Sequence, residues 1–122
     1  MKRLIFIILF SVTFVLSATE ISTEFVSGTW TSGGSPYNVN CDIQIPDGET
    51  LSIEPGTEIV FQGHYWINVQ GQILAEGTEG DNIIFRAENQ EEGWMGVRFD
   101  QTPISNGPSN INYCHFSYGN AN

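Results

Sequence analysis

A repeat of about 24 residues between Asp42 and Phe85 is the feature that most constrains the fold of this chain. Two groups of apolar residues recur with this spacing: Ile43, Ile45, Ile59, Val60 and Phe61 return as Ile67, Val69, Ile83, Ile84 and Phe85. Between them, residues 51–57 match residues 73–78 with one residue deleted. A period in the low twenties, with three apolar alternations separated by glycine-rich turns, is typical of stacked β coils. We therefore expect three short strands in each repeat of a solenoid.

The alternation of apolar and polar residues assigns one buried and one exposed face to each strand. Residues 39–45 are apolar at every odd position, which predicts a single strand with Val39, Cys41, Ile43 and Ile45 pointing inward. The same parity predicts that these later residues point inward: Ile59, Phe61, Ile67, Val69, Val97 and Phe99. Glycines at the corners, in segments 46–48 and 54–57, supply the positive φ that a tight bend requires.

The first 18 residues have the layout of a signal peptide. Lys2 and Arg3 precede an apolar run over residues 4–16, and the small residues Ser17 and Ala18 follow. The run is shorter than the roughly 20 residues of a membrane-spanning helix, so a retained anchor is the weaker interpretation. We expect export and cleavage after Ala18, or alternatively after Ser17, to give a secreted or cell-surface protein.

The charge of the mature chain restricts its partners. Without residues 1–18, Arg86 and Arg98 are the only strong cations against 14 acidic residues, a formal charge of −12. Nucleic acid binding requires clustered lysines and arginines, so it is excluded. A polyanionic glycan would be repelled unless Ca²⁺ bridged the two surfaces.

Two cysteines in an exported chain raise the question of a disulfide. Cys41 precedes the first repeat and Cys114 follows the last, so at least two rungs should separate them. At roughly 4.8 Å per rung their Cα atoms would be about 10 Å or more apart, beyond the roughly 7 Å limit for a bridge. Two buried free thiols are therefore favoured over a disulfide.

These patterns divide the chain into three parts: a signal peptide over residues 1–18, an aromatic-bearing N-terminal cap over residues 19–40, and coils over residues 41–122. Residues 100–110, which contain two prolines, form a longer loop that extends the third coil. An uncovered last rung is a template for aggregation. We therefore expect the sequence to be the N-terminal part of a longer protein, with about three coils present and further C-terminal coils to follow.

Several motifs extend over nearly the whole mature chain. They are Ile53-Glu54-Pro55-Gly56-Thr57 with Ile59-Val60-Phe61, the segment from Trp94 to Phe99, and a Ser-x-Ile-x-x-Cys-x-Phe pattern from Ser109 to Phe116. Together these motifs resemble secreted bacterial right-handed parallel β-helix proteins of pectate-lyase-like architecture. The resemblance implies an all-β solenoid. It also implies that the first parallel sheet lines a cleft for glycans, as it does in enzymes of that family.

Outward-facing residues of this sheet are the candidate binding site. If the coils stack in register, Gln44, Asn68 and Arg98 align in one row, and Trp66 and Asp100 share their outward parity. A tryptophan can stack on a pyranose ring, and amide and guanidinium groups can hydrogen-bond to hydroxyls or carboxylates. The alternative is that these side chains only satisfy solvent-facing positions of the sheet.

No catalytic or metal-binding residue is assigned. Four aspartates fall at corners or strand ends of different coils, so the sequence gives only a weak signal for Ca²⁺ and none for another cofactor: Asp42, Asp47, Asp81 and Asp100. His64 and His115 lack a partner at the spacing of a catalytic triad. We expect an exported, non-catalytic scaffold that binds a polysaccharide or surface glycan. The alternative is the N-terminal part of a polysaccharide lyase or glycoside hydrolase whose catalytic coils lie beyond residue 122.

Overall fold

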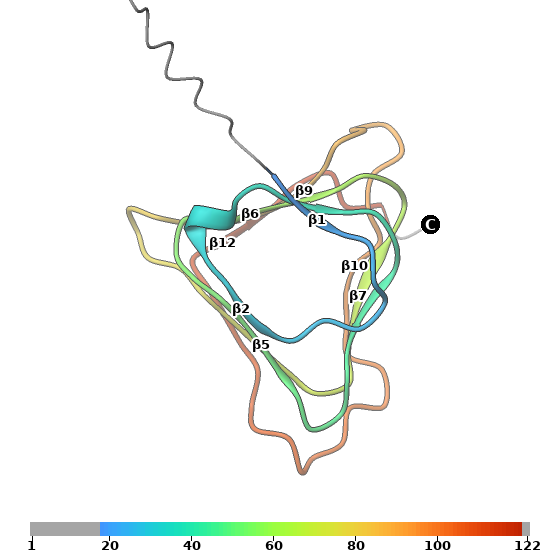
Figure 1. Ribbon diagram of the computed structural model, residues 1–122, viewed down its shortest axis with the longest axis vertical. Helices are drawn as coiled ribbons and strands as arrows, with labels where there is room; N and C mark the ends of the chain where they lie inside the picture. The colour runs from blue at the N-terminus through green and yellow to red at the C-terminus, as the bar shows by residue number, and fades with distance from the viewer. Residues whose placement is uncertain (1–17, 121–122) are drawn as a thin grey trace, which may run out of the picture.

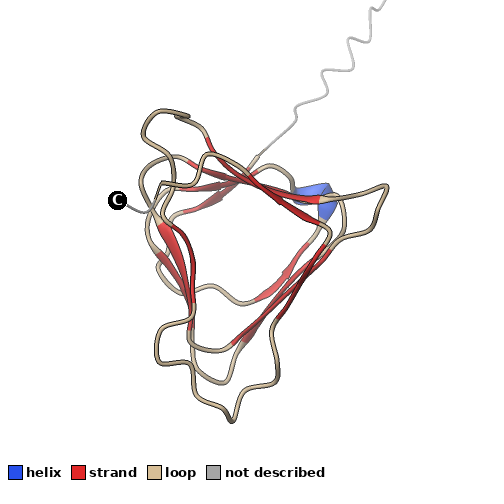
Figure 2. Cartoon of the chain, turned by 180° about the vertical axis from the view of Figure 1, so that it is seen from behind, coloured by secondary structure: helices blue, strands red, loops and turns tan. Residues whose placement is uncertain are grey.

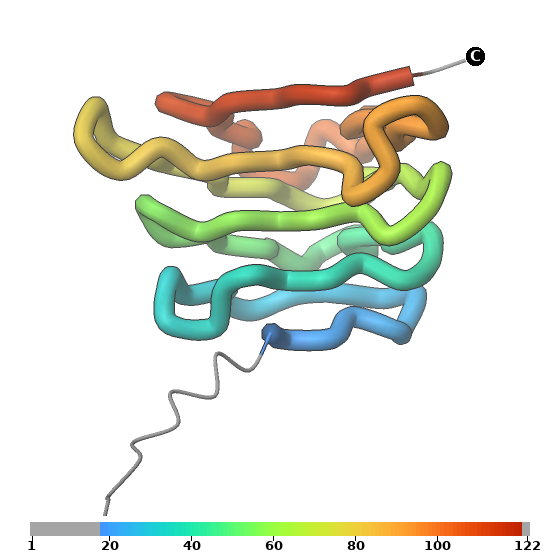
Figure 3. Tube along the Cα trace, turned by 90° about the horizontal axis from the view of Figure 1, so that it is seen from above, coloured from blue at the N-terminus to red at the C-terminus, as the bar shows by residue number. Residues whose placement is uncertain are grey.

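The chain winds around the three sides of a triangle, with strands on the sides and turns at the corners (Figures 1 and 2). Successive turns of the chain stack on one another along the axis of the molecule (Figure 3). The computed structural model describes residues 18–120. Apart from Ala18, the predicted signal peptide lies outside the described residues.

Every strand pairing in the described residues is parallel, and the strands form three sheets. Sheet A contains, in order, β1 (Thr19–Ile21), β3 (Tyr37–Val39), β6 (Glu58–Phe61), β9 (Ile83–Ala87) and β12 (Cys114–Phe116). Sheet B contains β4 (Ile43–Ile45), β7 (Trp66–Val69) and β10 (Gly96–Arg98). Sheet C contains β2 (Gly28–Trp30), β5 (Thr50–Ile53), β8 (Gln72–Glu76) and β11 (Asn110–Asn112). One short 3₁₀ turn, η1 (Ser32–Gly34), accompanies them, so the described chain is all-β with parallel sheets, as a parallel β-helix requires.

The core is the interior of the triangle, filled by one inward side chain at every second position. Fully buried aliphatic residues come from all three sheets: Ile43, Ile45, Leu51, Ile59, Ile67, Val69, Ile73 and Ile83. Each contributes roughly 1.5–3 kcal/mol by burial. Trp94 is also buried, and its ring stacks on Phe61 with the centroids 4.4 Å apart. The parity predicted for the interior rows is confirmed by this burial.

The strand register agrees with the sequence repeat in two sheets and departs from it in the third. Ile43 pairs with Ile67 in sheet B, and Leu51 pairs with Ile73 in sheet C, as the repeat predicts. In sheet A, Ile59 pairs with Phe85 and not with Ile83, a shift of two residues from the predicted match. The corner over residues 77–82 is longer than its counterpart, which accounts for the shift. Because side chains alternate with a period of two, the shift keeps the same residues inward.

The strand predicted over residues 39–45 is two strands. β3 ends at Val39 in sheet A, residues 40–42 turn a corner, and β4 begins at Ile43 in sheet B. The alternation continues through the corner because both strands direct their odd-numbered side chains into the same core. Cys41 lies in the corner and is half-buried, not fully buried as the pattern predicts.

Phe99 is predicted to point into the core, and this prediction is wrong, because the residue is 51 % exposed. β10 ends at Arg98, and the chain then leaves sheet B to form the loop that precedes β11. Other inward positions of the last row are also partly exposed, with Ile111 at 37 % and Phe116 at 44 %, since no described strand pairs beyond them.

Residues 19–40, expected to be a cap, carry β1, β2, η1 and β3 and so extend sheets A and C. Trp30 is 5 % exposed and stacks on Tyr37 with a centroid separation of 4.8 Å, so it covers core. At the corners, Gly48 and Gly56 have φ values of 82° and 78°, as the sequence predicts. Gly71 is required for space: a Cβ there would lie 2.1 Å from the carbonyl oxygen of Glu49.

Candidate functional site

A column of outward side chains crosses the strands of sheet B. Gln44 on β4, Asn68 on β7 and Arg98 on β10 are direct partners in the parallel register. Phe25, in the segment before β2, joins the column through an isolated parallel bridge to Gln44. We call these four residues the sheet-B column. The three that the sequence predicted to align do align, while their role in binding stays a prediction.

Trp66 begins β7 beside this column and is half-exposed. The guanidinium carbon of Arg98 lies 4.8 Å from the centroid of the indole, a cation–π distance. Arg98 Nη2 lies 3.8 Å from a carboxylate oxygen of Asp100, which is exposed. Arg98 therefore covers the indole from the β10 side and is itself oriented by Asp100.

A pocket of about 190 Å³ lies on the β4 side of Trp66. It is lined by Glu24, Asp42, Ile43, Gln44, Trp66 and Asn68. We call this cavity the acidic pocket, because two of these side chains are carboxylates and none is a cation. Pockets for whole small-molecule ligands typically measure about 300–1,000 Å³, so this one suits a single ring or functional group of a longer ligand.

Backbone pairing fixes the walls of the acidic pocket. The segment containing Glu24 runs alongside β4, where Gln44 N donates to Glu24 O at 2.7 Å and Val26 N donates to Gln44 O at 3.0 Å. On the β7 side, Trp66 N donates to Asp42 Oδ1 at 3.2 Å, which holds the carboxylate of Asp42 against the start of β7. The site therefore combines a positioned carboxylate with an aromatic ring.

One buried acceptor at the site has no partner. Asn68 Oδ1 is buried and forms no hydrogen bond within the described residues. A buried polar atom without a partner costs about 1–3 kcal/mol. A ligand hydroxyl or ammonium group that reached this oxygen would remove that cost.

The loop over residues 99–109 is held against the corner between sheets B and C. Asn106 Oδ1 accepts from Gly48 N at 3.0 Å, and Asn106 Nδ2 donates to Asp47 Oδ1 at 2.8 Å. Gln70 Nε2 donates to the carbonyl of Asp100 at the start of the loop. None of the loop residues lines the acidic pocket.

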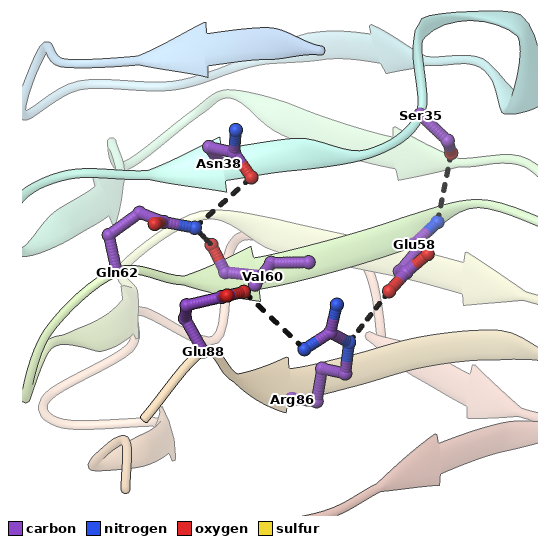
Figure 4. A network of polar contacts seen from close by, with 7 residues as sticks. All are labelled: Ser35, Asn38, Glu58, Val60, Gln62, Arg86 and Glu88. Carbon is purple, nitrogen blue, oxygen red and sulfur yellow. Dashed lines mark hydrogen bonds and ion pairs between the residues drawn. The ribbon is translucent and has the colours of Figure 1, made fainter. Parts of the chain in front are cut away.

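The outer face of sheet A provides a contrast, because its polar groups are paired with one another (Figure 4). Arg86 Nε donates to Glu58 Oε1 at 2.7 Å, and Arg86 Nη1 lies 3.6 Å from Glu88. Gln62 Nε2 donates to Asn38 Oδ1 at 3.1 Å. These pairs stabilise the stacking of neighbouring strands and leave fewer polar groups for a ligand.

Both cysteines are free thiols in the structure and both are half-buried. Partial burial raises the pKa of the Cys41 thiol, and the carboxylates of Asp42 and Glu24 raise it further. Burial also raises the pKa of Cys114. The two carboxylates of the acidic pocket therefore act together on the neighbouring thiol.

Within residues 18–120, no group of three or more His, Cys, Asp or Glu side chains could hold a metal ion. His64 Nδ1 lies 3.4 Å from the carbonyl of Gly93 in a corner. No helix in this part of the chain is long and apolar enough to cross a membrane.

Comparisons of the chain with models of protein families, with curated proteins and with solved structures gave no significant match. The function must therefore be inferred from the site itself.

Sequence reasoning missed Glu24, Phe25 and Asp42 as members of the site. Glu24 and Phe25 precede the repeat, and Phe25 lies 19 residues from its partner Gln44, a spacing outside the 24-residue period. Asp42 was noted only as an isolated acid at a strand end. The only sequence signal was an aromatic residue, Phe25, directly after the polar residues Ser22, Thr23 and Glu24.

Proposed function

We propose that this chain is an exported, non-catalytic parallel β-helix scaffold that binds glycans across the outer face of sheet B. The observation that carries the proposal is the acidic pocket, in which the half-exposed Trp66 adjoins hydrogen-bonding side chains and the unpartnered oxygen of Asn68. Sugar rings are recognised by an aromatic surface together with a few fixed polar groups. Such a site suits a polysaccharide or a surface glycan.

The sheet-B column gives the site length. Phe25 is 60 % exposed and lies two rows of strands from Asn68 and Trp66. At roughly 4.8 Å between neighbouring strands, the two aromatic rings are separated by about 10 Å along the axis. This separation allows two units of an oligosaccharide to be contacted at once. Binding in an open groove of this kind is weak, with dissociation constants on the order of 0.1–1 mM.

We also propose that the coil is right-handed and has a pectate-lyase-like architecture. A right-handed coil is supported by the strong right-handed preference of connections between parallel strands. Pectate-lyase-like architecture is supported by the three parallel sheets and by the motifs from Ile53 to Phe61 and from Ser109 to Phe116.

Export is supported by the signal-peptide layout of residues 1–18. Mass spectrometry of the secreted protein should find a new N-terminus at Thr19, or at Ala18 for the alternative cleavage. A mature product that retained Met1 would contradict export through this segment.

The test of glycan binding is a glycan array followed by calorimetry with Trp66→Ala and Phe25→Ala. Both variants should weaken binding by about fivefold or more, if a sugar ring gains from stacking about as much as the roughly 1–3 kcal/mol of a nucleic-acid base on an aromatic side chain. Tyr113→Ala is the matched control, because Tyr113 is also 60 % exposed but lies outside the sheet-B column. If all three variants bind as the parent does, sheet B is not the glycan site.

A glycoside hydrolase is the second candidate, because the acidic pocket contains two carboxylates, Glu24 and Asp42. Hydrolysis of a glycosidic bond uses such a pair as acid and as base or nucleophile. Release of reducing sugars by the parent, and its loss in Asp42→Asn, would favour the hydrolase over the scaffold.

A further inference from the structure

The charge of the acidic pocket narrows the class of sugar. Glu24 and Asp42 both line the cavity and no lysine or arginine does, while Arg98 lies on the β10 side of Trp66 in an ion pair with Asp100. The mature chain as a whole carries a formal charge of −12. A uronate carboxylate placed here would be repelled, whereas a cationic group would be attracted.

The available hydrogen-bonding groups point in the same direction. Asp42 Oδ1 accepts from Trp66 N, and Asp42 Oδ2 has no hydrogen-bond partner within residues 18–120. Asn68 also lines the cavity, and its buried carbonyl oxygen is unpartnered. An ammonium group has three donors and no acceptor, so it matches a cavity that presents carboxylate and amide oxygens.

We propose that the acidic pocket selects amino sugars, with the protonated amino group of a hexosamine unit between Glu24 and Asp42 and its ring beside Trp66. The proposal rests on the proposed function and makes it specific. Arg98 shields the other side of the indole, so the sugar enters from the β4 side. Neutral hexoses bind by stacking and hydroxyl hydrogen bonds without the ion pairs, and oligouronates are repelled.

The test compares three β-1,4-linked tetrasaccharides that differ only at carbon 2: glucosamine, N-acetylglucosamine and glucose. Calorimetry on the purified full chain should show the glucosamine tetramer binding roughly two- to thirtyfold more tightly than either neutral tetramer, which is the range for two partly exposed charge pairs. The preference should shrink at high salt, because exposed charges are screened.

Charge-neutralising variants locate the preference. Glu24→Gln and Asp42→Asn keep the shape of each side chain, and each should reduce the preference for the glucosamine tetramer over the glucose tetramer by up to about fivefold. Glu54→Gln is the matched control, since it removes one exposed negative charge at a corner that does not line the pocket. Unfolding midpoints equal to that of the parent establish that the variants are folded.

The outcomes separate the two proposals. Equal binding of the three tetramers overturns selection of amino sugars and leaves glycan binding intact. A loss in Glu54→Gln as large as that in Glu24→Gln shows a general charge effect and also overturns it. If none of the tetramers binds and the glycan array is blank, the proposed function fails as well.

Discussion

Two isoleucines with the same inward parity should differ sharply in their contribution to stability. Ile67 is the middle residue of a row in sheet B, with β4 on one side and β10 on the other, and it is fully buried. Ile111 pairs with the buried Ala75, but β11 is an edge strand and Ile111 is 37 % exposed. Replacement of each by alanine removes the same atoms from two different rows.

The expected magnitudes follow from burial. Truncation to alanine removes three carbons, worth about 0.8 kcal/mol each when buried, or about 2.4 kcal/mol for Ile67. The cavity left between two rows adds to this loss, which brings Ile67→Ala to about 3–4 kcal/mol. At Ile111 the space opens to solvent, so the cavity contribution vanishes and the loss is about 1.5 kcal/mol or less.

Urea unfolding monitored by tryptophan fluorescence measures both values, because Trp94 is buried in the core and reports on its loss. The free energy of unfolding should fall about 2 kcal/mol further in Ile67→Ala than in Ile111→Ala. Equal losses in the two variants would refute the reasoning, since they would show that the middle and last rows are equally enclosed.

Three further predictions follow from close contacts, the loop and the thiols. Gly71→Ala should cost about 1–3 kcal/mol, because the new Cβ would meet the carbonyl oxygen of Glu49, whereas Gly80→Ala meets nothing within 4 Å and should be near neutral in the same unfolding assay. Asn106→Ala should accelerate proteolysis within residues 100–109 while leaving the midpoint of unfolding almost unchanged. Cys41 and Cys114 should react more slowly with iodoacetamide at neutral pH in the native protein than in urea, because burial raises the pKa of both thiols and only the thiolate reacts. A pKa raised in the folded state also lowers the free energy of unfolding as the pH rises above about 8.5, which a pH series would detect.

The sequence predicts the stacked parallel strands because each coil buries one row of side chains on the row before it. That requirement makes apolar residues recur with a fixed period, so the partners Ile43 and Ile67 can be matched from their spacing alone. Corners are under weaker constraint, since a corner only has to return the chain to the next side. The corner over residues 77–82 therefore lengthens without a trace in the apolar pattern, and Ile59 meets Phe85 and not Ile83.

The candidate site likewise contains residues that follow the repeat and residues that lie outside it. Gln44, Asn68 and Arg98 were predictable because they occupy equivalent outward positions of successive coils. Glu24 and Phe25 were not, because their segment joins sheet B through a single bridge and two backbone hydrogen bonds to Gln44. A contact of that size imposes no alternation on the sequence, so only the structure places these two residues on the site.

The two outer faces of the coil differ in how their polar groups are paired, which bears on the proposed placement of a ligand on sheet B. On sheet A, Arg86 is paired with Glu58 and Glu88, so ligand binding there would first have to break ion pairs already formed. On sheet B, the oxygen of Asn68 is buried without a partner, which lowers the stability of the folded chain by about 1–3 kcal/mol. A ligand that donates a hydrogen bond to this oxygen recovers that cost on binding. The unpartnered oxygen of Asn68 therefore supports the proposed placement of a ligand on sheet B, independently of the aromatic residues there.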